Sequence, residues 1–254
     1  MESGAKILAV AGKGGVGKTS ISAAMVRSLC EAYPDKRILA IDADPAVGLS
    51  TALGITVGET LDDIRREVAG EVTERQGGGV GDILQSVRGR LLRAMEHCGG
   101  CDFFAVGRPE TAGCYCAVNT YLRQVIGLLI GDYDYVVIDS EAGIEQINRR
   151  VLERVTHLLL VSDASRKGLQ VIRTVRQVAR ELVMYERCGA VINRVPDGVS
   201  RDEIDTGDIP LLAVIGEDAA QTEFDILGKT VFDLPEDTGV LAGTRQALRA
   251  LDII

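Results

Sequence analysis

The sequence predicts an α/β fold with a mainly parallel sheet that is flanked by helices on both faces. Two observations indicate this fold. Short apolar runs alternate with helix-like stretches along most of the 254 residues. One run leads into a glycine-rich turn, and two others end in an aspartate. We find no internal repeat, and the glycine-rich stretch 76–81 is interpreted as a loop. We therefore expect residues 1–254 to form a single domain.

The predicted strands are continuously apolar, which is typical of strands that helices cover on both faces. In chain order they span residues 7–11, 37–42, 103–106, 135–139, 158–161, 190–193 and 211–215. Apolar residues at helical spacing follow the first strand and recur over residues 169–182. Further helices are expected over residues 117–130 and from about Thr238 to Leu251.

The amino-acid composition and the net charge indicate which classes of protein and of binding partner to expect. The formal net charge of −9 argues against extensive contact with nucleic acid or an anionic membrane surface. No stretch approaches the ~20 apolar residues of a membrane helix, and the N-terminus lacks the pattern of a secretory signal. We therefore expect a cytoplasmic protein without stable membrane association. Its six cysteines then favour ligands, redox thiols or core residues over a disulfide framework.

A phosphate-binding loop is the clearest motif. The pattern G-x-x-x-x-G-K-[ST] predicts a P-loop NTPase, because it follows a strand and opens a helix. Glycines let backbone N–H groups surround phosphate oxygens, and the helix N-terminus adds positive potential. Lys18 can reach the β and γ phosphates, and the Thr19 hydroxyl can bind Mg²⁺. The expected nucleotide-binding residues are Gly12, Lys13, Gly14, Gly15, Val16, Gly17, Lys18, Thr19 and Ser20.

The additional lysine, Lys13, gives the loop the form K-G-G-x-G-K-T. This form resembles the deviant Walker A motif of the dimeric ATPases that include nitrogenase iron protein, the Min and chromosome-partition ATPases, and metallocentre-assembly ATPases. The resemblance implies a nucleotide-dependent homodimer in which Lys13 reaches the partner's nucleotide.

Two strands that end in acids complete the expected site. The resemblance implies that Asp44, in Asp42-Ala43-Asp44-Pro45, orients or activates the attacking water. It implies that Asp42 supports the Mg²⁺ shell or the loop; a helix or turn cap is the other interpretation of Asp42. Asp139 follows the strand 135–138 and resembles the Walker B acid, so Thr19, Asp42 and Asp139 are the expected Mg²⁺ residues. Acids at the carboxyl edge of an α/β sheet lie where such sheets bind ligands.

ATP is the expected nucleotide. GTPases of this class read guanine with Asn-Lys-x-Asp, whereas Asn193-Arg194-Val195-Pro196 has proline in the aspartate position. Without that carboxylate, guanine's N1–H and exocyclic amine have no acceptor. By the same resemblance, Asn193 occupies the position of an amide that contacts adenine.

Cys114 and Cys116 form a second motif. In extended backbone, residues i and i+2 face the same side, so both thiols can point at one target. Two sulfurs are too few for a closed site, but a two-fold dimer would supply four thiolates, a set that suits Zn²⁺ or another metal that prefers soft ligands. The segment 112–119 resembles the C-x-C region of the accessory ATPases that mature nickel carbon monoxide dehydrogenase. That resemblance covers essentially the whole chain.

The preferred hypothesis is therefore an ATPase that binds Ni²⁺ or Zn²⁺ through Cys114 and Cys116 and delivers metal to a client such as carbon monoxide dehydrogenase. An iron–sulfur reductase resembling nitrogenase iron protein is an alternative, although Asp139-Ser140-Glu141-Ala142-Gly143 lacks the cysteine usual there. A Min- or partition-type positioning ATPase is another. Three interpretations of Cys98 and Cys101 stay open: thiols in a loop, a pair of metal ligands, or a redox-active dithiol. Cys30 is expected in the core.

Overall fold

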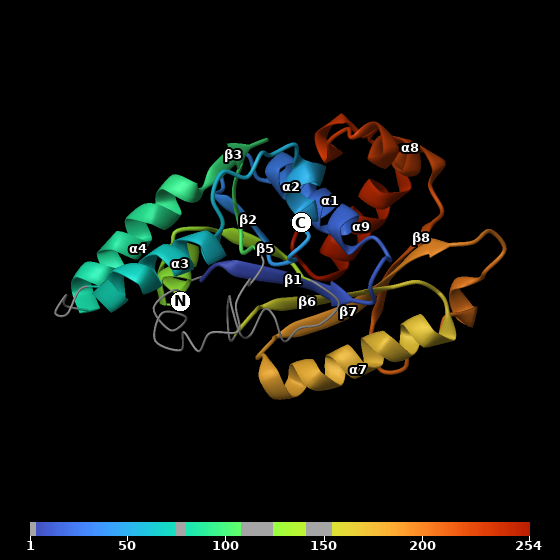
Figure 1. Cartoon of the computed structure of the whole chain (residues 1–254). Helices are drawn as coiled ribbons and strands as arrows, with labels where there is room; N and C mark the ends of the chain where they lie inside the picture. Colours follow the sequence, from blue (N-terminus) through green and yellow to red (C-terminus); the bar gives the residue numbers. More distant parts are fainter. Residues whose placement is uncertain (1–3, 75–79, 108–123, 141–153) are drawn as a thin grey trace.

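The computed structural model describes residues 4–74, 80–107, 124–140 and 154–254. Its centre is an eight-stranded sheet in the order β3-β4-β2-β5-β1-β6-β7-β8, in which only the β3–β4 pair is antiparallel (Figure 1). The strands are β1 (Lys6–Gly12), β2 (Ile38–Asp42), β3 (Glu96–Cys98), β4 (Cys101–Ala105), β5 (Tyr135–Asp139), β6 (His157–Ser162), β7 (Arg187–Val195) and β8 (Leu211–Gly216). The predicted α/β fold is confirmed.

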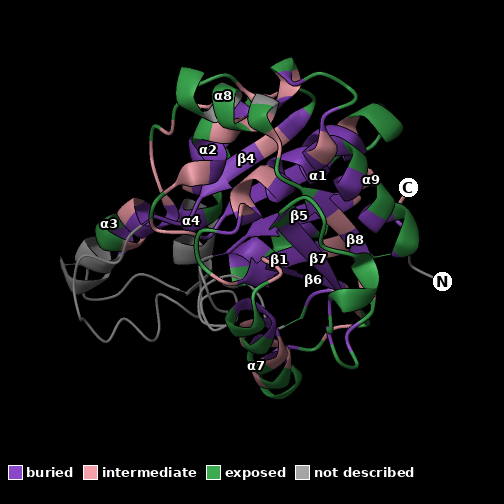
Figure 2. Ribbon diagram, turned by 90° about the vertical axis from the view of Figure 1, so that its right-hand side faces the viewer, coloured by how far each residue is buried: buried purple, intermediate pink, exposed green. Residues whose placement is uncertain are grey.

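Helices cover both faces of this sheet and bury two apolar layers. The helices are α1 (Lys18–Ala32), α2 (Gly48–Leu53), α3 (Leu61–Glu74), α4 (Val80–Ala94), α7 (Arg166–Leu182), α8 (Ala219–Leu227) and α9 (Gly239–Ala250), with short 3₁₀ turns η1 (Arg201–Glu203) and η2 (Val231–Asp233). Helices α1, α2 and α9 pack on one face, and α3, α4 and α7 pack on the other. Figure 2 shows the buried strands between the two helical layers, and this burial on both faces explains the continuous apolar runs of the strands.

The sheet order brings distant acids to one edge. Strand β5 lies between β1 and β2, and Asp139 pairs in register with both Val10 and Asp42. The turn after β1 leads into α1 at this same edge. The structure therefore brings the phosphate loop and the two acids together at the carboxyl ends of the strands, where the sequence predicts the site.

The predicted strands and the closing helix are confirmed, with small differences at their ends. Of the helix expected over 117–130, residues 124–130 are described, and they are helical. Strand β3 is missed, because Glu96-His97-Cys98 is short and polar. It forms a hairpin with β4 through Gly99 and Gly100, whose φ angles of 57° and 90° suit glycine.

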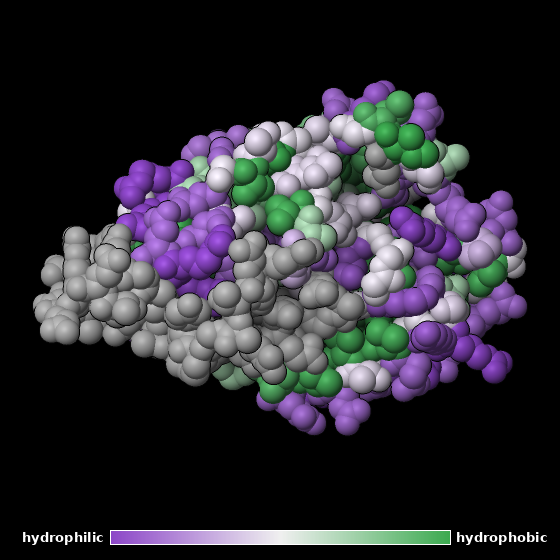
Figure 3. All heavy atoms as spheres, in the orientation of Figure 1, coloured by the Kyte–Doolittle hydropathy of each residue, from purple (hydrophilic) through white to green (hydrophobic). Residues whose placement is uncertain are grey.

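The surface in Figure 3 is mixed, with apolar side chains gathered over α8 at the upper right. Ile226 and Leu227 at the end of that helix are 79% and 57% exposed. In the part of the chain that the structure describes, no helix has the length and apolar character needed to cross a membrane.

Candidate nucleotide site

The phosphate loop joins β1 to α1 with a backbone that requires glycine. Gly12 has a φ of 141°, and a Cβ there would lie 2.0 Å from the Val161 carbonyl oxygen. Gly17 has a φ of 89° and a Cβ there would lie 2.6 Å from the Asn193 Nδ2. Gly14 and Gly15 face open space. The loop therefore places backbone, rather than side chains, at the start of α1. Helix N–H groups at that position can bind an anion.

The two lysines of the loop point to different partners. Lys18 is buried, and its ammonium donates to the Lys13 carbonyl oxygen at 3.2 Å, which holds it over the loop. The ammonium of Lys13 instead forms an ion pair with Asp163, directly after β6. Sequence analysis missed Asp163, because no local motif marks it and its partner is 150 residues away.

Asp139 is fully buried at the end of β5 and accepts two hydrogen bonds from α1. The Thr19 hydroxyl donates to its Oδ2 at 2.8 Å, and the Ser22 hydroxyl donates to its Oδ1 at 2.8 Å. Burial raises the pKa of Asp139 to about 6, although both hydroxyls oppose this shift. Ser22 was missed by sequence analysis; its spacing one turn after Lys18 and Thr19 is the only local signal.

Asp42 is also fully buried, and it organises the chain that follows β2. Its Oδ1 accepts from the Asp44 N–H at 3.1 Å, and its Oδ2 accepts from the Leu49 N–H at 2.8 Å. Burial, and then the charge of Asp139, raise the pKa of Asp42 to about 7. These contacts are those of a cap on the turn after β2, and support of the Mg²⁺ shell or the phosphate loop by Asp42 remains a prediction.

These groups fit Mg²⁺ chemically. Mg²⁺ takes hard oxygen ligands, commonly one or two carboxylates together with nucleotide phosphates and water. Thr19, Asp42 and Asp139 supply such oxygens beside the loop. Burial, and then the charge of Asp139, disfavour the ionised form of Asp42, so a bound cation would relieve an unfavourable interaction.

Asp44 and Ser20 lie in different surroundings. Asp44 is half-buried, and its Oδ1 accepts from the Ala46 N–H at 2.8 Å. Ser20 is half-buried on α1 and lines a hollow with Gln221 and Thr230, beside α2 and η2. The structure thus places Asp44 next to Asp42, while Ser20 borders a surface formed by α8 and η2.

Asn193 and Arg194 brace the phosphate loop from β7. The buried Asn193 amide donates to the Val16 carbonyl oxygen at 2.8 Å, and Arg194 donates to the Gly15 carbonyl oxygen at 3.0 Å. Contact between Asn193 and adenine remains a prediction. The bracing role of both residues went unnoticed in the sequence, since β7 lies far from the loop along the chain.

The cysteines divide into two groups. Cys114 and Cys116 lie outside the described residues, as does the stretch from Glu141 to Gly143. Cys98 and Cys101 lie on the β3–β4 hairpin at the sheet edge, not in a loop. Cys30, expected in the core, is half-buried and packs against the core cluster beside Cys101. Within the described ranges, no three His, Cys, Asp or Glu residues are arranged to hold a metal ion.

Comparison with known protein families decides the classification. The family model for the CobQ/CobB/MinD/ParA nucleotide binding domain matches residues 7–231. The chain belongs to this family. An uncharacterized ATP-binding protein of Methanocaldococcus jannaschii is 36% identical over 240 residues, which cover 92% of this chain and 93% of the relative. The carbon monoxide dehydrogenase accessory protein CooC of Rhodospirillum rubrum is 30% identical over 247 residues, 89% of each chain.

The fold is similar to that of a ParA family ATPase from Chlorobium tepidum. The two superpose with a TM-score of 0.70 at 23% identity, covering 97% of this chain and 99% of the other. The resemblance to deviant Walker A ATPases is confirmed, and the chain is an ATPase that converts ATP and water to ADP and phosphate. The phosphate loop and its neighbouring acids are the geometry that suits this reaction.

Proposed function

We propose that this ATPase matures a metallocentre, by inserting nickel into carbon monoxide dehydrogenase or a related enzyme. The observation that carries the proposal is the similarity to the CooC accessory protein along 89% of the chain. The Cys114-Tyr115-Cys116 motif supports it, because two thiols per subunit become four in a symmetric dimer. Ni²⁺ or Zn²⁺ is the proposed cargo at that interface.

The connection between β4 and β2 supports a link between nucleotide and metal. The Val106 N–H, directly after β4, donates to the Asp42 carbonyl oxygen at 2.7 Å. Gly107 follows with a φ of 83°, against Thr60. The chain thus leaves β4 beside Asp42, and a hydrogen bond joins Asp42 to the residue that precedes Gly107, seven positions before Cys114 in the sequence.

For hydrolysis, we assign each residue a role according to the part of the nucleotide, metal or water that it acts on. Water attacks the γ-phosphorus, the bond to the β–γ bridging oxygen breaks, and ADP leaves. Lys18 stabilises charge on the transferring phosphoryl group, and Asp44 orients the water. Thr19, Asp42 and Asp139 would hold Mg²⁺, which would neutralise phosphate charge. Asn193 contacts adenine through the amide that braces the loop.

The proposed active unit is a homodimer that forms with ATP. In the single chain, Lys13 is bound to Asp163 rather than directed into its own loop. This arrangement supports a role for Lys13 in the partner's site, since Lys18 alone of the two lysines lies over its own loop. Dimer formation then requires Lys13 to exchange Asp163 for the partner's nucleotide.

The test measures metal per chain and mass in solution, with and without ATP, on anaerobically purified protein. We expect one Ni²⁺ or Zn²⁺ per dimer and tighter metal binding with ATP, because linkage is reciprocal. Cys114→Ser with Cys116→Ser should abolish this metal but leave nucleotide binding intact, and Cys188→Ser is the matched control. The same protein should activate a nickel carbon monoxide dehydrogenase that lacks its metal.

Other results would support other functions. Metal bound tightly by monomers, or retained in the double variant, would contradict the interface site. Broad visible absorbance would support an iron–sulfur reductase. A colourless, metal-free protein that binds DNA or anionic vesicles only with ATP would support a positioning ATPase.

A further inference from the structure

Three thiols gather at the sheet edge, at the end of α1 opposite the phosphate loop. Cys98 ends β3 and Cys101 begins β4, and they pair in register across the hairpin turn. Cys30 lies on the last turn of α1. A Cβ added to Gly100 in that turn would lie 3.8 Å from the Cys30 Cβ and 3.9 Å from its Sγ.

Cys30 and Cys101 contact each other directly, and their surroundings make them unlike. Cys30 packs against the apolar cluster that contains Cys101, and the Cys101 Sγ donates to the Cys98 carbonyl oxygen at 3.1 Å. The neighbouring Cys101 thiol lowers the pKa of Cys30, and the Cys30 thiol together with burial raises the pKa of Cys101. Cys101 is 3% exposed, whereas Cys30 is half-buried. A partly exposed thiol beside a buried one is the arrangement of an attacking and a resolving cysteine.

We propose that Cys30 and Cys101 form an oxidisable dithiol that a hydroperoxide converts to a disulfide, joining α1 to β4. The Cys30 thiolate attacks one oxygen of hydrogen peroxide, the O–O bond breaks, Cys30 becomes a sulfenic acid, and the leaving hydroxide takes up the proton lost by the Cys30 thiol to give the first water. The Cys101 sulfur then attacks the Cys30 sulfur, and the sulfenic oxygen leaves as water with the Cys101 proton. In total, two thiols lose two electrons and two protons, and one hydrogen peroxide becomes two waters.

The third thiol, Cys98, forms its hydrogen bond with a different element, α2. Its Sγ donates to the Leu53 carbonyl oxygen at 3.1 Å, at the end of α2, and burial raises its pKa. Cys98 is therefore the less nucleophilic of the two partly exposed thiols. It serves as a matched control on the same hairpin.

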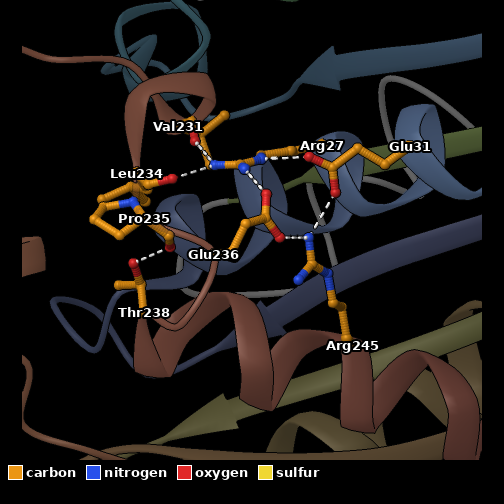
Figure 4. Close-up of polar contacts among 8 residues, drawn as sticks. All are labelled: Arg27, Glu31, Val231, Leu234, Pro235, Glu236, Thr238 and Arg245. Atoms are coloured by element: carbon orange, nitrogen blue, oxygen red, sulfur yellow. Dashed lines mark hydrogen bonds and ion pairs between the residues drawn. The ribbon is translucent and has the colours of Figure 1, made fainter.

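The surrounding structure holds the reacting thiols in place. Arg27 of α1 donates to the carbonyl oxygens of Val231 at 2.8 Å and Leu234 at 2.7 Å, which ties η2 to α1 (Figure 4). In η2, the Phe232 ring packs on the hairpin turn, where a Cβ on Gly99 would lie 2.2 Å from its Cζ. The disulfide thus joins elements that already pack together.

The proposed disulfide lies at the far end of a helix that begins at the nucleotide site, so it can affect that site. Helix α1 begins at Lys18 and ends beside Cys30, while α2 begins beside Asp42 and ends at Leu53, the acceptor of Cys98. Both helices therefore run from the nucleotide site to the thiol cluster. A covalent link between the end of α1 and β4 restrains the helix that begins at the site.

The test treats reduced wild-type protein with a small excess of hydrogen peroxide, blocks the remaining thiols with N-ethylmaleimide, and digests it without reductant. Trypsin with chymotrypsin puts Cys30 on a different peptide from the Cys98–Cys101 hairpin, and both on peptides without Cys114 or Cys116. We expect a dithiothreitol-sensitive link between the Cys30 peptide and the hairpin peptide. It should persist in Cys98→Ser and disappear in Cys30→Ser and Cys101→Ser.

Thermal unfolding provides a second measurement. Because the disulfide closes a long loop in the unfolded chain, Tm should rise on the order of 5 °C on oxidation in wild type and Cys98→Ser, and not in Cys30→Ser. A disulfide within the hairpin peptide, an unlinked Cys30, or a link that leaves Tm unchanged would overturn the proposal. If a variant fails to fold, the wild-type peptide map alone decides.

Discussion

The ammonium of Lys13 is paired with the carboxylate of Asp163 in the same chain. Lys13 belongs to the phosphate loop, and Asp163 follows β6, the neighbour of β1 in the sheet. Both side chains are about 30% exposed, so the pair is weak enough to exchange. This pair gives a structural account of how an undimerised chain holds the lysine that is proposed to act on a partner.

Asp163→Asn should therefore favour the ATP-dependent dimer. Removing the intrachain partner takes away the competing interaction of Lys13, and a partly exposed pair is worth up to about 1 kcal/mol, or about fivefold in dimer affinity for each of the two pairs that must exchange. Sedimentation with ATP over a protein concentration series measures this. Asp205→Asn, which removes a salt bridge to Arg173 on α7, is the control and should leave dimer affinity unchanged. Weaker dimers in Asp163→Asn would contradict the competition.

Lys13→Ala should lose ATP-driven dimerisation and hydrolysis while the monomer keeps its nucleotide affinity within about threefold, because Lys18 still lies over the loop. A mixture with Asp44→Ala provides the decisive measurement. In the mixed dimer, one site has its own Asp44 and receives Lys13 from the partner. Turnover above that of either variant alone is expected; its absence would argue against a shared site.

Asp44→Ala should bind ATP and accumulate as the closed dimer. Loss of water orientation slows the chemical step more than binding, so turnover should fall at least about 100-fold with little change in ATP affinity. Phosphate release and mass in solution are measured on the same samples. Hydrolysis at the wild-type rate would remove Asp44 from the mechanism.

The stability of the nucleotide-free protein should depend on pH through Asp42. Its pKa is about 7 in the fold against 3.8 ordinarily, so the native chain retains a proton that the unfolded chain releases. This stabilising contribution is full below 3.8 and is lost as the pH rises through about 7. Between about pH 5.5 and about 8, wild type should lose stability relative to Asp42→Asn, which cannot titrate.

Urea unfolding at several pH values measures that difference. His157, whose pKa burial lowers, is present in both proteins and contributes equally to each. Parallel pH profiles for the two proteins would show that Asp42 does not carry the effect. Saturating Mg²⁺ and ADP should reduce the difference, because a bound cation favours the ionised carboxylate.

Arg27→Met should destabilise the fold by about 3 kcal/mol, because it leaves two buried carbonyl oxygens without their charged donor. Glu236, which pairs with both Arg27 and Arg245, would lose one partner as well. The expected fall in Tm is about 5–10 °C. Arg245→Met, which removes a more exposed guanidinium from the same network, is the control and should cost less. Equal losses would show that the carbonyl contacts carry little energy.

Much of the fold is predictable because it depends on neighbours in the chain. The strands buried on both faces are marked by continuous apolar runs, and the loop at 12–19 is marked by its own glycines and lysines. Strand β3 escaped because its three residues have no apolar pattern, and its pairing depends on the glycine turn that follows. The Cys114–Cys116 motif is likewise local, and its metal and its partner chain remain predictions.

The sequence by itself thus determined the α/β class, the phosphate loop and the acids at the strand ends, since each is a contiguous pattern. Tertiary structure decided which side chains meet. Sheet order places Ser22 on Asp139, Asp163 on Lys13, and Cys101 on Cys30. Each pair joins residues from elements that are distant in sequence, and no spacing rule along the chain encodes such contacts. The packing of helices on a sheet brings them together, because burial of the two apolar layers fixes where each helix lies.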